Sequence, residues 1–438
     1  MKYVSVQDLV EQNQVVIKTG PFGTQLKASE YVSFGTPVLN VRNLGFATVN
    51  TDKLEMVSDG TLERLSAHKL VTGDIVFGRK GAVERHAFIS ESENGWMQGS
   101  DCIRLRVLAD SVNPRFLSYY FLTKRHRAFM MSMCSHGTTM ASLNQKIIEK
   151  IIVPLPERSI QDKVVEILAT LDKQIVTNQK INENLRQQAQ ALFKKWFVDN
   201  PDAILWKEGT FSNLIEKTIS GDWGKDSPSG NNTEMVYCIR GADIPEVRAG
   251  NKGKMPTRYI LPKNYAAKQL VDGDIVVEIS GGSPTQSTGR AAAVSDALLA
   301  RYDKGMVCTN FCKALKPRAG YSMYVYYYWQ YLYDRDIFFS YENGTTGIKN
   351  LDINGFIETE PIVIAPEDLV EKFDAVCQTV FSKIYANGME NEQLALVRDT
   401  ILPKLMSGEI DDPAMLRLIV VKAVFHLIPP NVNDNLAA

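Results

Sequence analysis

The chain has 438 residues, of which 45% are hydrophobic and 23% are charged, an ordinary composition for a globular protein. Its length predicts roughly two to four domains that each bury a core. The 49 Lys and Arg residues nearly balance the 50 Asp and Glu residues, for a net charge of -1. This balance excludes a uniformly basic nucleic-acid coat and an acidic disordered tail, but it leaves room for a local basic patch.

The composition also argues against a membrane protein and a metalloprotein. No apolar run reaches the roughly 20 residues that a membrane-spanning helix needs, and the first ten residues lack the pattern of a signal peptide. The six Cys are scattered, and the one close pair, Cys308 and Cys312, has no second pair to complete a zinc site. We therefore expect a cytoplasmic protein with no membrane partner and no metal site.

Residues 1–153, called head 1 here, combine short β-branched runs with a helical pattern. The runs at 74–77 and 102–107 are bounded by glycine or polar residues, and residues 114–131 follow a helical period. This mixture is typical of an α/β or α+β domain without the regular alternation of a Rossmann sheet.

A long amphipathic helix is expected within 154–200. Its apolar or seam positions follow a 4-3-4-4-3-4-3-4-3-4 spacing, which is the pattern of a coiled-coil seam with one stutter near Leu171. These positions are Ile160, Val164, Ile167, Leu171, Ile175, Asn178, Asn182, Leu185, Ala189, Leu192 and Trp196.

The rest of the chain repeats this layout. Residues 201–366, called head 2, precede a second long helix in 367–412, and each seam position of that helix is its counterpart plus 209. Gly-Asp-Ile-Val occurs at 73–76 and again at 273–276, and Gly-Thr-Thr at 137–139 and again at 344–346. The agreement in spacing predicts a tandem repeat of head and helix rather than two unrelated surface helices.

The connectivity predicts how the two helices pair. Head 2 joins the end of one helix to the start of the other, so the helices leave it side by side and antiparallel, as in a dumbbell with pseudo-twofold symmetry. Asn178 should then face Asn391, and Asn182 should face Asn387, which would fix the register at some cost in stability. The alternative is that these four asparagines face solvent or a partner.

Several motifs together resemble the DNA-specificity subunit of a type I restriction-modification system, over about residues 1–412. The segment Gly20-Pro21-Phe22-Gly23-Thr24-Gln25-Leu26 resembles the opening of many target-recognition domains of that family. Pro154-Leu155-Pro156 resembles the start of its first conserved helix, and Leu402-Pro403-Lys404-Leu405 the end of its second.

The resemblance implies a domain order and a set of partners. Residues 1–153 and 201–366 would be target-recognition domains, each recognising one half of a bipartite site in double-stranded DNA. Residues 154–200 and 367–412 would be the conserved helices that set the spacer between the halves and dock two methyltransferase subunits, through which endonuclease/translocase subunits join. S-adenosylmethionine, ATP and Mg would belong to those partners, with no cofactor in this chain, and the role of the tail at 413–438 is unknown.

The chain lacks the residue patterns of an enzyme. There is no Walker A loop, no Asn-Pro-Pro-aromatic motif of the amino-methyltransferases, and no nucleophile elbow. We therefore expect a non-catalytic subunit of a restriction and adenine-methyltransferase complex.

Charge and loop positions suggest where DNA would bind. Head 1 has 18 Lys and Arg residues against 14 Asp and Glu, whereas residues 202–366 have 18 against 19. The leading candidates follow equivalent expected strands, and the alternative for any one of them is a solvated hairpin tip. They are Arg79, Lys80 and Arg85 in head 1 and Gln286, Thr288 and Arg290 in head 2. Weaker candidates are Lys18, Gln25, Lys27, Arg42, Lys225, Arg240, Lys252, Lys254 and Arg258.

Two further hypotheses about function stay open. The chain could be a helical-rod adaptor that binds proteins through both heads without DNA, or, less plausibly, a stand-alone methyltransferase. Steep salt dependence of duplex binding would favour DNA recognition over the adaptor, because neutralised phosphates release counterions. The aromatic run Tyr324–Tyr333 could stack on bases, but its helical spacing favours packing in the core.

Overall fold

The computed structural model describes residues 2–21, 23, 25–134, 141–283, 285–344 and 348–409. The chain forms two compact units: unit 1 comprises residues 1–173 and the chain from Leu394 onward, and unit 2 comprises Gln174–Gln393. These units differ from the expected domain boundaries because each unit includes its head together with a part of both long helices. The Gly-Thr-Thr positions 137–139 and 345–346 and the tail at 413–438 lie outside the described residues.

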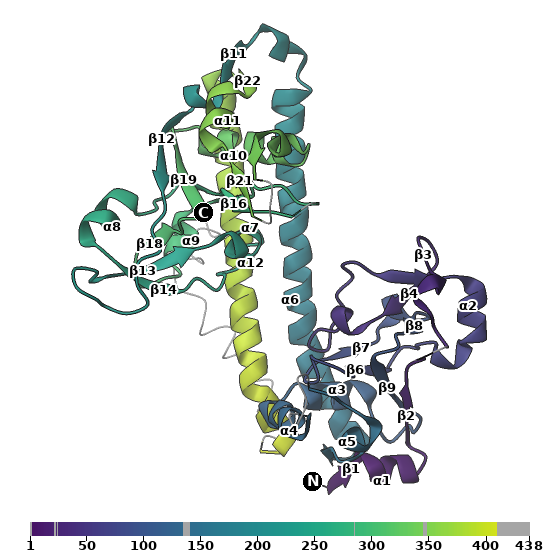
Figure 1. Cartoon of the computed structure of the whole chain (residues 1–438). Helices are drawn as coiled ribbons and strands as arrows, with labels where there is room; N and C mark the ends of the chain where they lie inside the picture. The colour runs from purple at the N-terminus through teal and green to yellow at the C-terminus, as the bar shows by residue number, and fades with distance from the viewer. Residues whose placement is uncertain are drawn as a thin grey trace, which may run out of the picture. The chain divides into compact units, whose positions relative to one another are not determined.

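Unit 1 contains two four-stranded sheets and one two-stranded pair (Figure 1). The antiparallel sheet has the order β2 (Val15–Thr19), β9 (Cys102–Val107), β6 (Ile75–Gly78), β7 (His86–Phe88). The mixed sheet has the order β3 (Tyr31–Val32), β5 (Glu55–Val57), β4 (Thr36–Leu39), β8 (Met97–Gln98). The pair is β1 (Lys2–Ser5) with β10 (Ile152–Leu155). The helices are α1 (Val6–Glu11), α2 (Asp59–Arg64), α3 (Pro114–Phe121), α4 (Lys124–Cys134) and α5 (Gln145–Glu149).

Unit 2 repeats this plan with one additional small sheet. Its antiparallel sheet has the order β12 (Ile215–Ser220), β19 (Cys312–Pro317), β15 (Ile275–Glu278), β17 (Ala291–Ala293). Its mixed sheet has the order β14 (Thr257–Ile260), β13 (Glu234–Ile239), β18 (Met306–Cys308), and the pair is β11 (Lys207–Thr210) with β22 (Pro361–Ile364). The additional sheet has the order β16 (Ser280–Gly281), β21 (Lys349–Leu351), β20 (Glu342–Asn343). The helices are α7 (Ile244–Arg248), α8 (Pro262–Lys268), α9 (Asp296–Leu299), α10 (Ser322–Tyr333) and α11 (Ile353–Thr359).

The repeat predicted from the sequence is therefore a repeat of topology, and the mixed α and β fold class is confirmed. The Gly-Asp-Ile-Val motif has a structural explanation. Gly73 and Gly273 have φ of 91° and 83°, which favour glycine, in the turn before β6 and β15. Asp74 and Asp274 are buried, and each accepts a 2.9 Å hydrogen bond from a backbone N–H of its turn. Each is neutralised from the neighbouring strand, Asp74 by Arg106 and Asp274 by Lys316.

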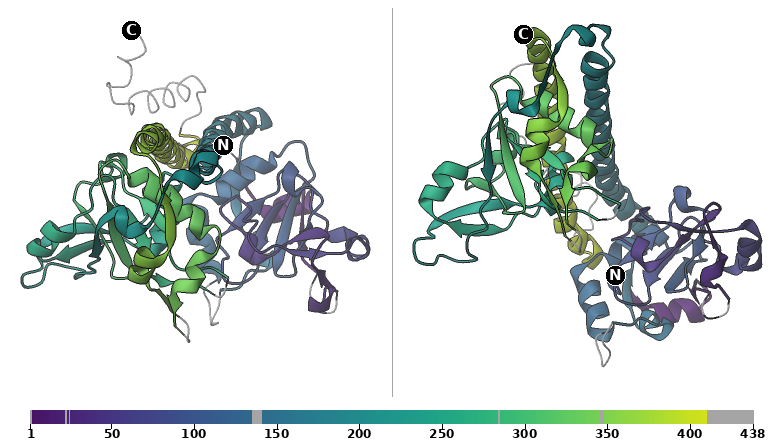
Figure 2. Two further views of the ribbon diagram at one scale, coloured as in Figure 1. Left: turned by 90° about the horizontal axis from the view of Figure 1, so that it is seen from above. Right: turned by 45° about the horizontal axis from the view of Figure 1, so that its top comes forward.

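The two long helices are α6 (Arg158–Phe193), which ends in a π-helical turn at Lys194–Val198, and α12 (Glu367–Ser407). In unit 2 the two helices lie side by side (Figure 2) and run antiparallel. Asn178 Nδ2 donates to Asn391 Oδ1 at 3.0 Å, and Asn387 Nδ2 donates to Asn182 Oδ1 at 2.8 Å. All four are at least 94% buried, and their pairing is the one that the antiparallel arrangement predicts.

The predicted seam is wrong near the heads, where the buried stripe moves by one residue. Ile160 and Val376 are about 40% exposed, at 38% and 41%, whereas their neighbours Gln161 and Cys377 are fully buried. A two-helix seam buries only a narrow stripe, but here the helices also pack against a head, which requires a wider apolar face. The Gln161 side chain accepts from the backbone N–H of Asn113 at 2.8 Å, so the buried amide joins α6 to the segment before α3.

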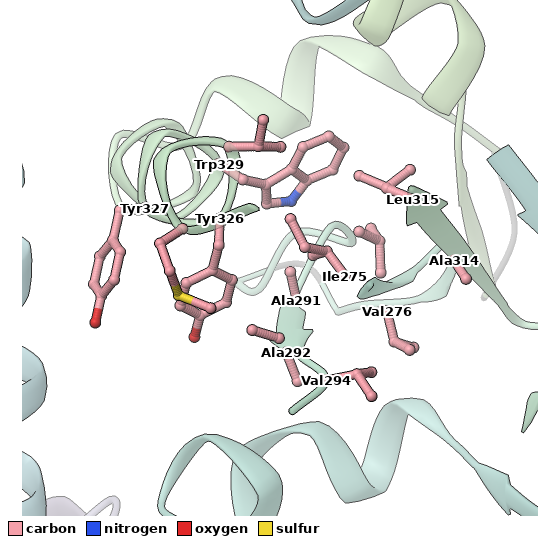
Figure 3. Close-up of a cluster of buried hydrophobic side chains, with 14 of the residues drawn as sticks. Ile275, Val276, Ala291, Ala292, Val294, Ala314, Leu315, Tyr326, Tyr327 and Trp329 are labelled. Atoms are coloured by element: carbon pink, nitrogen blue, oxygen red, sulfur yellow. The ribbon is translucent and has the colours of Figure 1, made fainter. Parts of the chain in front are cut away.

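The aromatic run on α10 packs in the core of unit 2, as its helical spacing predicts. Figure 3 shows Trp329 and Tyr326 on the side of β15, β17 and β19, near residues such as Ile275 and Leu315, whereas Tyr327 points away from the strands. Tyr327 packs against Phe373 and Phe381 of α12. Trp329 is fully buried, and its indole N–H donates to the Gly289 carbonyl at 2.8 Å. These rings are therefore not available to stack on bases.

Candidate nucleic-acid interface

In unit 1 the loop after β6 is held by a second segment of the chain. Arg79 N–H donates to the Asp101 carbonyl at 2.8 Å, and the Arg79 carbonyl accepts from Leu143 N–H at 2.7 Å. Lys80 forms an isolated antiparallel bridge with Ser142. The residues that directly follow the 135–140 segment therefore lie beside the loop that carries the leading candidates of head 1.

Unit 2 has the same arrangement in a more regular form. β16, directly after β15, pairs with β21, and Ser280 Oγ donates to Asn350 Oδ1 at 2.6 Å. The sequence analysis missed β21 as part of this site, including the exposed Asn350 and the partly exposed Lys349. The Gly-Thr-Thr repeat lies just before Ser142 in head 1 and just before β21 in head 2. It indicated that the two segments are equivalent, but it did not indicate that they contact the loops after β6 and β15.

The end of the β6–β7 hairpin differs in charge from the end of the β15–β17 hairpin. The strand registers end at Phe77 opposite His86 and at Val277 opposite Ala291. Continued by one residue, they place Gly78 opposite Arg85 in unit 1 and Glu278 opposite Arg290 in unit 2. Arg290 donates to both carboxylate oxygens of Glu278, at 2.8 and 2.7 Å, and these hydrogen bonds raise the pKa of the guanidinium. Gly78 offers no such partner, and Arg85 is exposed, with Glu84 at 3.7 Å.

Arg85 and Arg127 both lie over the ring of Phe46, which is 42% exposed. Their guanidinium carbons are 5.7 and 5.4 Å from the ring centroid. Arg127 belongs to α4, whose first turn also carries the exposed Lys124 and Arg125. Arg85 and Arg127 thus meet at the Phe46 ring, and Lys124 and Arg125 lie in the same turn of α4 as Arg127. Such a set of cations suits contacts to phosphate oxygens.

Three candidates in head 2 have partners inside the fold. Thr288 is fully buried, and both its N–H and its hydroxyl donate to Glu342 Oε1. Arg258 is 6% exposed, stacks 4.0 Å from the Trp223 ring centroid and pairs with Asp226. Arg240 pairs with Asp243 at 2.8 Å and also donates to the Lys254 carbonyl. These side chains stabilise loops, and we omit them from the proposed contact surface.

The remaining candidates differ in exposure. Those that are exposed are Gln25, Lys27, Arg42, Lys80, Arg85, Lys225, Lys254 and Gln286. Those that are half-buried are Lys18, Arg79, Lys252 and Arg290. Lys18 and Gln25 line one pocket of about 430 Å³ together with Arg64 and His68, so the structure brings these two weaker candidates together. Arg42 pairs with Glu55 at 2.9 Å, and Lys252 lies 4.5 Å from the Tyr302 ring centroid.

The buried histidines of head 1 add no positive charge to this surface. His86 follows Arg85 and begins β7, and His126 lies beside Arg127 on α4. Burial lowers the pKa of both imidazoles to about 3, with a smaller contribution from neighbouring positive charges. Both rings are therefore neutral at pH 7, and His86 Nε2 lies 2.9 Å from Ser118 Oγ.

Two searches of the described residues bear on other classes of site. No group of three or more His, Cys, Asp or Glu side chains that could hold a metal ion was found in the described part of the chain. Within the same residues, no helix is both long and apolar enough to cross a membrane.

Comparisons with known proteins show which class this chain is similar to. The family described as the type I restriction modification DNA specificity domain matches residues 17–187, which cover most of head 1 and the greater part of α6. The chain is 26% identical over 321 residues to the type I restriction enzyme MjaIX specificity subunit of Methanocaldococcus jannaschii, covering 69% of this chain and 70% of the relative. It is 22% identical over 408 residues to the HindI specificity subunit of Haemophilus influenzae, covering 77% and 86%.

A solved structure supports the fold over almost the whole chain. The crystal structure of the S subunit of a type I restriction-modification system from M. genitalium matches with a TM-score of 0.53 and 15% identity, covering 92% of this chain and 96% of that one. The chain is thus similar over most of its length to specificity subunits of type I restriction enzymes, and residues 17–187 match the DNA specificity domain of that family.

Proposed function

We propose that this chain is the DNA-recognition subunit of a type I restriction-modification complex, in which each head recognises one half of a bipartite duplex site. One observation carries the proposal. In both units the loop after an equivalent strand, β6 or β15, lies beside the segment that follows Gly-Thr-Thr. A duplicated loop arrangement fits two half-sites, because protein symmetry in DNA-binding proteins mirrors the symmetry of the site.

The proposed contacts fall into two groups. Arg79, Lys80 and Arg85 in head 1 and Gln286 in head 2 lie in the loops and would approach base edges, where Arg and Lys match guanine O6 and N7 and Gln matches adenine N6 and N7. The first turn of α4 would contact phosphates and position head 1 without recognising sequence.

The partners follow from the family. Helices α6 and α12 would dock two methyltransferase subunits, and endonuclease/translocase subunits would join through them. S-adenosylmethionine, ATP and Mg would bind to those subunits, and this chain would supply recognition and assembly. α6 has 36 residues and is about 54 Å long at 1.5 Å per residue, a length that suits a spacer between half-sites.

A head exchange tests the proposal. Replacing residues 1–153 with the head of a relative should change one half of the methylated motif of the source cell and leave the other half intact, as determined by methylome sequencing. If both halves change, or if no bipartite motif depends on this chain, the proposal fails.

A change in helix length tests the spacer. Inserting four residues after Leu171 adds about 6 Å to α6. We expect a changed spacer with both half-sites preserved, measured in the same methylome assay. An unchanged spacer would mean that the helix does not determine the distance between half-sites.

A further inference from the structure

Head 2 exposes a phenylalanine in the turn between β18 and β19. In this turn the Cys312 N–H donates to the Thr309 carbonyl at 2.9 Å, and Phe311 lies between these two residues. Phe311 is 60% exposed, and among the described residues its ring has no aromatic or cationic partner. Most of the ring is therefore in contact with water and contributes little to the core of unit 2.

The backbone of Phe311 is fixed, although its ring is exposed. Its N–H donates to Thr309 Oγ1 at 3.2 Å, and the buried Thr309 donates its own N–H to the Ile239 carbonyl at 3.0 Å. The Phe311 carbonyl accepts from the N–H groups of Ile279 and Ser280 at 2.9 and 3.3 Å. The ring is thus carried by a preorganised turn, so little backbone entropy is lost when it contacts a partner.

The turn lies beside the loop that carries the leading candidates of head 2. Ile279 donates its N–H to the Phe311 carbonyl, and the Ile279 carbonyl accepts from Leu351 N–H of β21 at 2.8 Å. The segment after β15 therefore runs between the Phe311 turn and β21, which also carries the exposed Asn350. Phe311 thus borders the loop arrangement that the proposed function assigns to DNA.

Apolar and hydrogen-bonding side chains are combined at this place. Ile348, which directly precedes β21, is 61% exposed. Ser280 Oγ donates to Asn350 Oδ1 at 2.6 Å, which leaves the N–H groups of the Asn350 amide as donors. The major groove presents a matching combination, because the C5 methyl group of thymine lies there next to the donors and acceptors of the base edges.

Head 1 makes the same backbone contact with a different side chain. Asp101 directly precedes β9, as Phe311 directly precedes β19. The Asp101 carbonyl accepts from Arg79 N–H at 2.8 Å, in the place of the bond between Phe311 and Ile279. Any residue supplies a carbonyl, so the side chain is free to differ, and it is an exposed carboxylate in one head and an exposed ring in the other. Such variation at a fixed position is expected where two domains recognise different half-sites.

We propose that Phe311 contacts the C5 methyl group of a thymine in the major groove of the half-site that head 2 recognises. This inference rests on the proposed function and adds a specificity-determining residue to it. An apolar contact suits head 2, because its candidates Thr288, Arg258 and Arg240 already have partners inside the fold. Phe311 favours thymine at one position by burying the methyl group, and the polar side chains beside it pair with other groups of the base edges.

Uracil in place of thymine tests this contact, because the two bases differ only by the C5 methyl group. The half-site of head 2 is the one that the exchange of residues 1–153 leaves intact. The full-length chain in complex with its methyltransferase subunits is titrated with duplexes in which each thymine of this half-site, and one thymine of the spacer, is replaced in turn. We expect one replacement in the half-site to weaken binding about fourfold, as for the loss of one buried methyl group, and the spacer replacement to have no effect.

Variants assign the effect to the ring. In Phe311→Ala the sensitive position should bind thymine and uracil equally, with every other position unchanged, whereas Phe311→Leu, which retains an apolar side chain, should keep part of the preference. Because Phe311 is exposed, Phe311→Ala should unfold in urea at the same midpoint as the parent chain. Phe34→Ala is the matched control, because it removes a ring that is 88% exposed in head 1, and it should leave the thymine preference of the head 2 half-site unchanged.

An unchanged thymine preference at every position in Phe311→Ala would overturn the proposal. It would also be overturned if the parent complex tolerated uracil at every thymine of this half-site, or if the half-site contained no thymine. In each of these cases sequence-specific binding to a bipartite motif persists, so the proposed function stands. Failure of the proposed function gives a different result, in which the parent complex binds all duplexes alike, and this inference then fails with it.

Discussion

The two units place arginine at the same point of the same hairpin and use it differently. Arg85 is exposed because the opposite strand residue is Gly78, whereas Arg290 is held by the carboxylate of Glu278. A duplicated fold thus leaves the arginine exposed in one unit and holds it in an internal ion pair in the other. A shared position in a repeat therefore does not imply a shared role, and the residue across the ladder decides which role it takes.

The helix pair shows the same divergence. In unit 1, Asp172 on α6 accepts from Tyr119 Oη at 2.7 Å and pairs with Arg398 on α12 at 2.9 Å. The counterparts in unit 2 are apolar, with Phe381 in the position of Asp172 and Ala189 in that of Arg398. Unit 1 therefore joins head and helices by a charged network, and unit 2 by aromatic packing, which includes a Tyr327–Phe381 contact with ring centroids 6.4 Å apart.

Among the substitutions, the largest loss of stability is expected from breaking the ion pair of unit 2. Glu278→Ala leaves Arg290 half-buried without its partner and should lower the free energy of unfolding of unit 2 by about 3 kcal/mol. Urea unfolding followed by tryptophan fluorescence measures this, because four of the five tryptophans lie in unit 2. The matched variant Glu84→Ala, which removes the half-buried partner of the exposed Arg85, should cost less than about 0.5 kcal/mol. Equal costs would contradict the comparison.

Acid should destabilise unit 1 selectively, because unit 2 has no histidine. The pKa of His86 and of His126 is about 3 in the folded chain, below the ordinary 6.5, so the unfolded chain binds more protons between these values. The contribution of each histidine to the free energy of unfolding is therefore fully present above about pH 6.5 and is lost as the pH falls toward 3. At pH 5 the loss is about 2 kcal/mol per histidine.

Peptide-resolved hydrogen exchange, corrected for intrinsic rates, distinguishes the units during this titration. Protection in unit 1 should fall between pH 7 and pH 5 while unit 2 changes less. His126→Phe keeps the ring that packs 4.8 Å from Phe121 and should remove about half of the pH dependence. A parallel loss of protection in both units would show that these histidines do not control acid stability.

Substitutions in the two asparagine pairs should lower the free energy of unfolding by smaller amounts, and by different amounts in the two pairs. Asn178→Leu alone leaves Asn391 buried without its partner and should cost about 2 kcal/mol, whereas Asn178→Leu/Asn391→Leu should cost less than the sum of the single changes by about 1 kcal/mol. Asn182 also donates to the carbonyls of Ile384 and Ala249, so the Asn182→Leu/Asn387→Leu variant loses these two hydrogen bonds as well and should be less stable. Additive costs at the first pair, measured in a double-mutant cycle, would exclude a direct coupling.

The smallest expected effect is a change in the salt dependence of DNA binding when Arg85 or Arg290 is replaced. Arg85→Ala should reduce by about 1 the slope of log affinity for duplex DNA against log salt concentration, because one phosphate contact is lost. Arg290→Ala should leave the slope unchanged in protein that remains folded, because Glu278 already neutralises this side chain. Lys163→Ala, at an exposed position on α6, controls for the loss of one positive charge. The comparison of the two hairpins fails if Arg290→Ala lowers the slope as much as Arg85→Ala.

The sequence by itself determined the repeat, both long helices and the pairing of the asparagines. These features depend on local periodicity and on spacing along the chain, and a periodic pattern carries over directly into a helix face. The sequence also determined that Tyr324–Tyr333 packs as a helix, since its spacing fits a core face. The predicted seam positions Asn178, Asn182, Asn387 and Asn391 are buried in the middle of the helices, where each helix mainly contacts the other.

Only the tertiary structure decided the remaining points. The buried stripe moves from Val376 to Cys377 because head 2 packs against the helix there, and no period within the helix contains that information. The division of the candidate residues into exposed ones and ones with a partner depends on residues far apart in sequence, such as Thr288 and Glu342. Long-range contacts of this kind form only when the sheets assemble, because strand register and not chain distance brings the two side chains together.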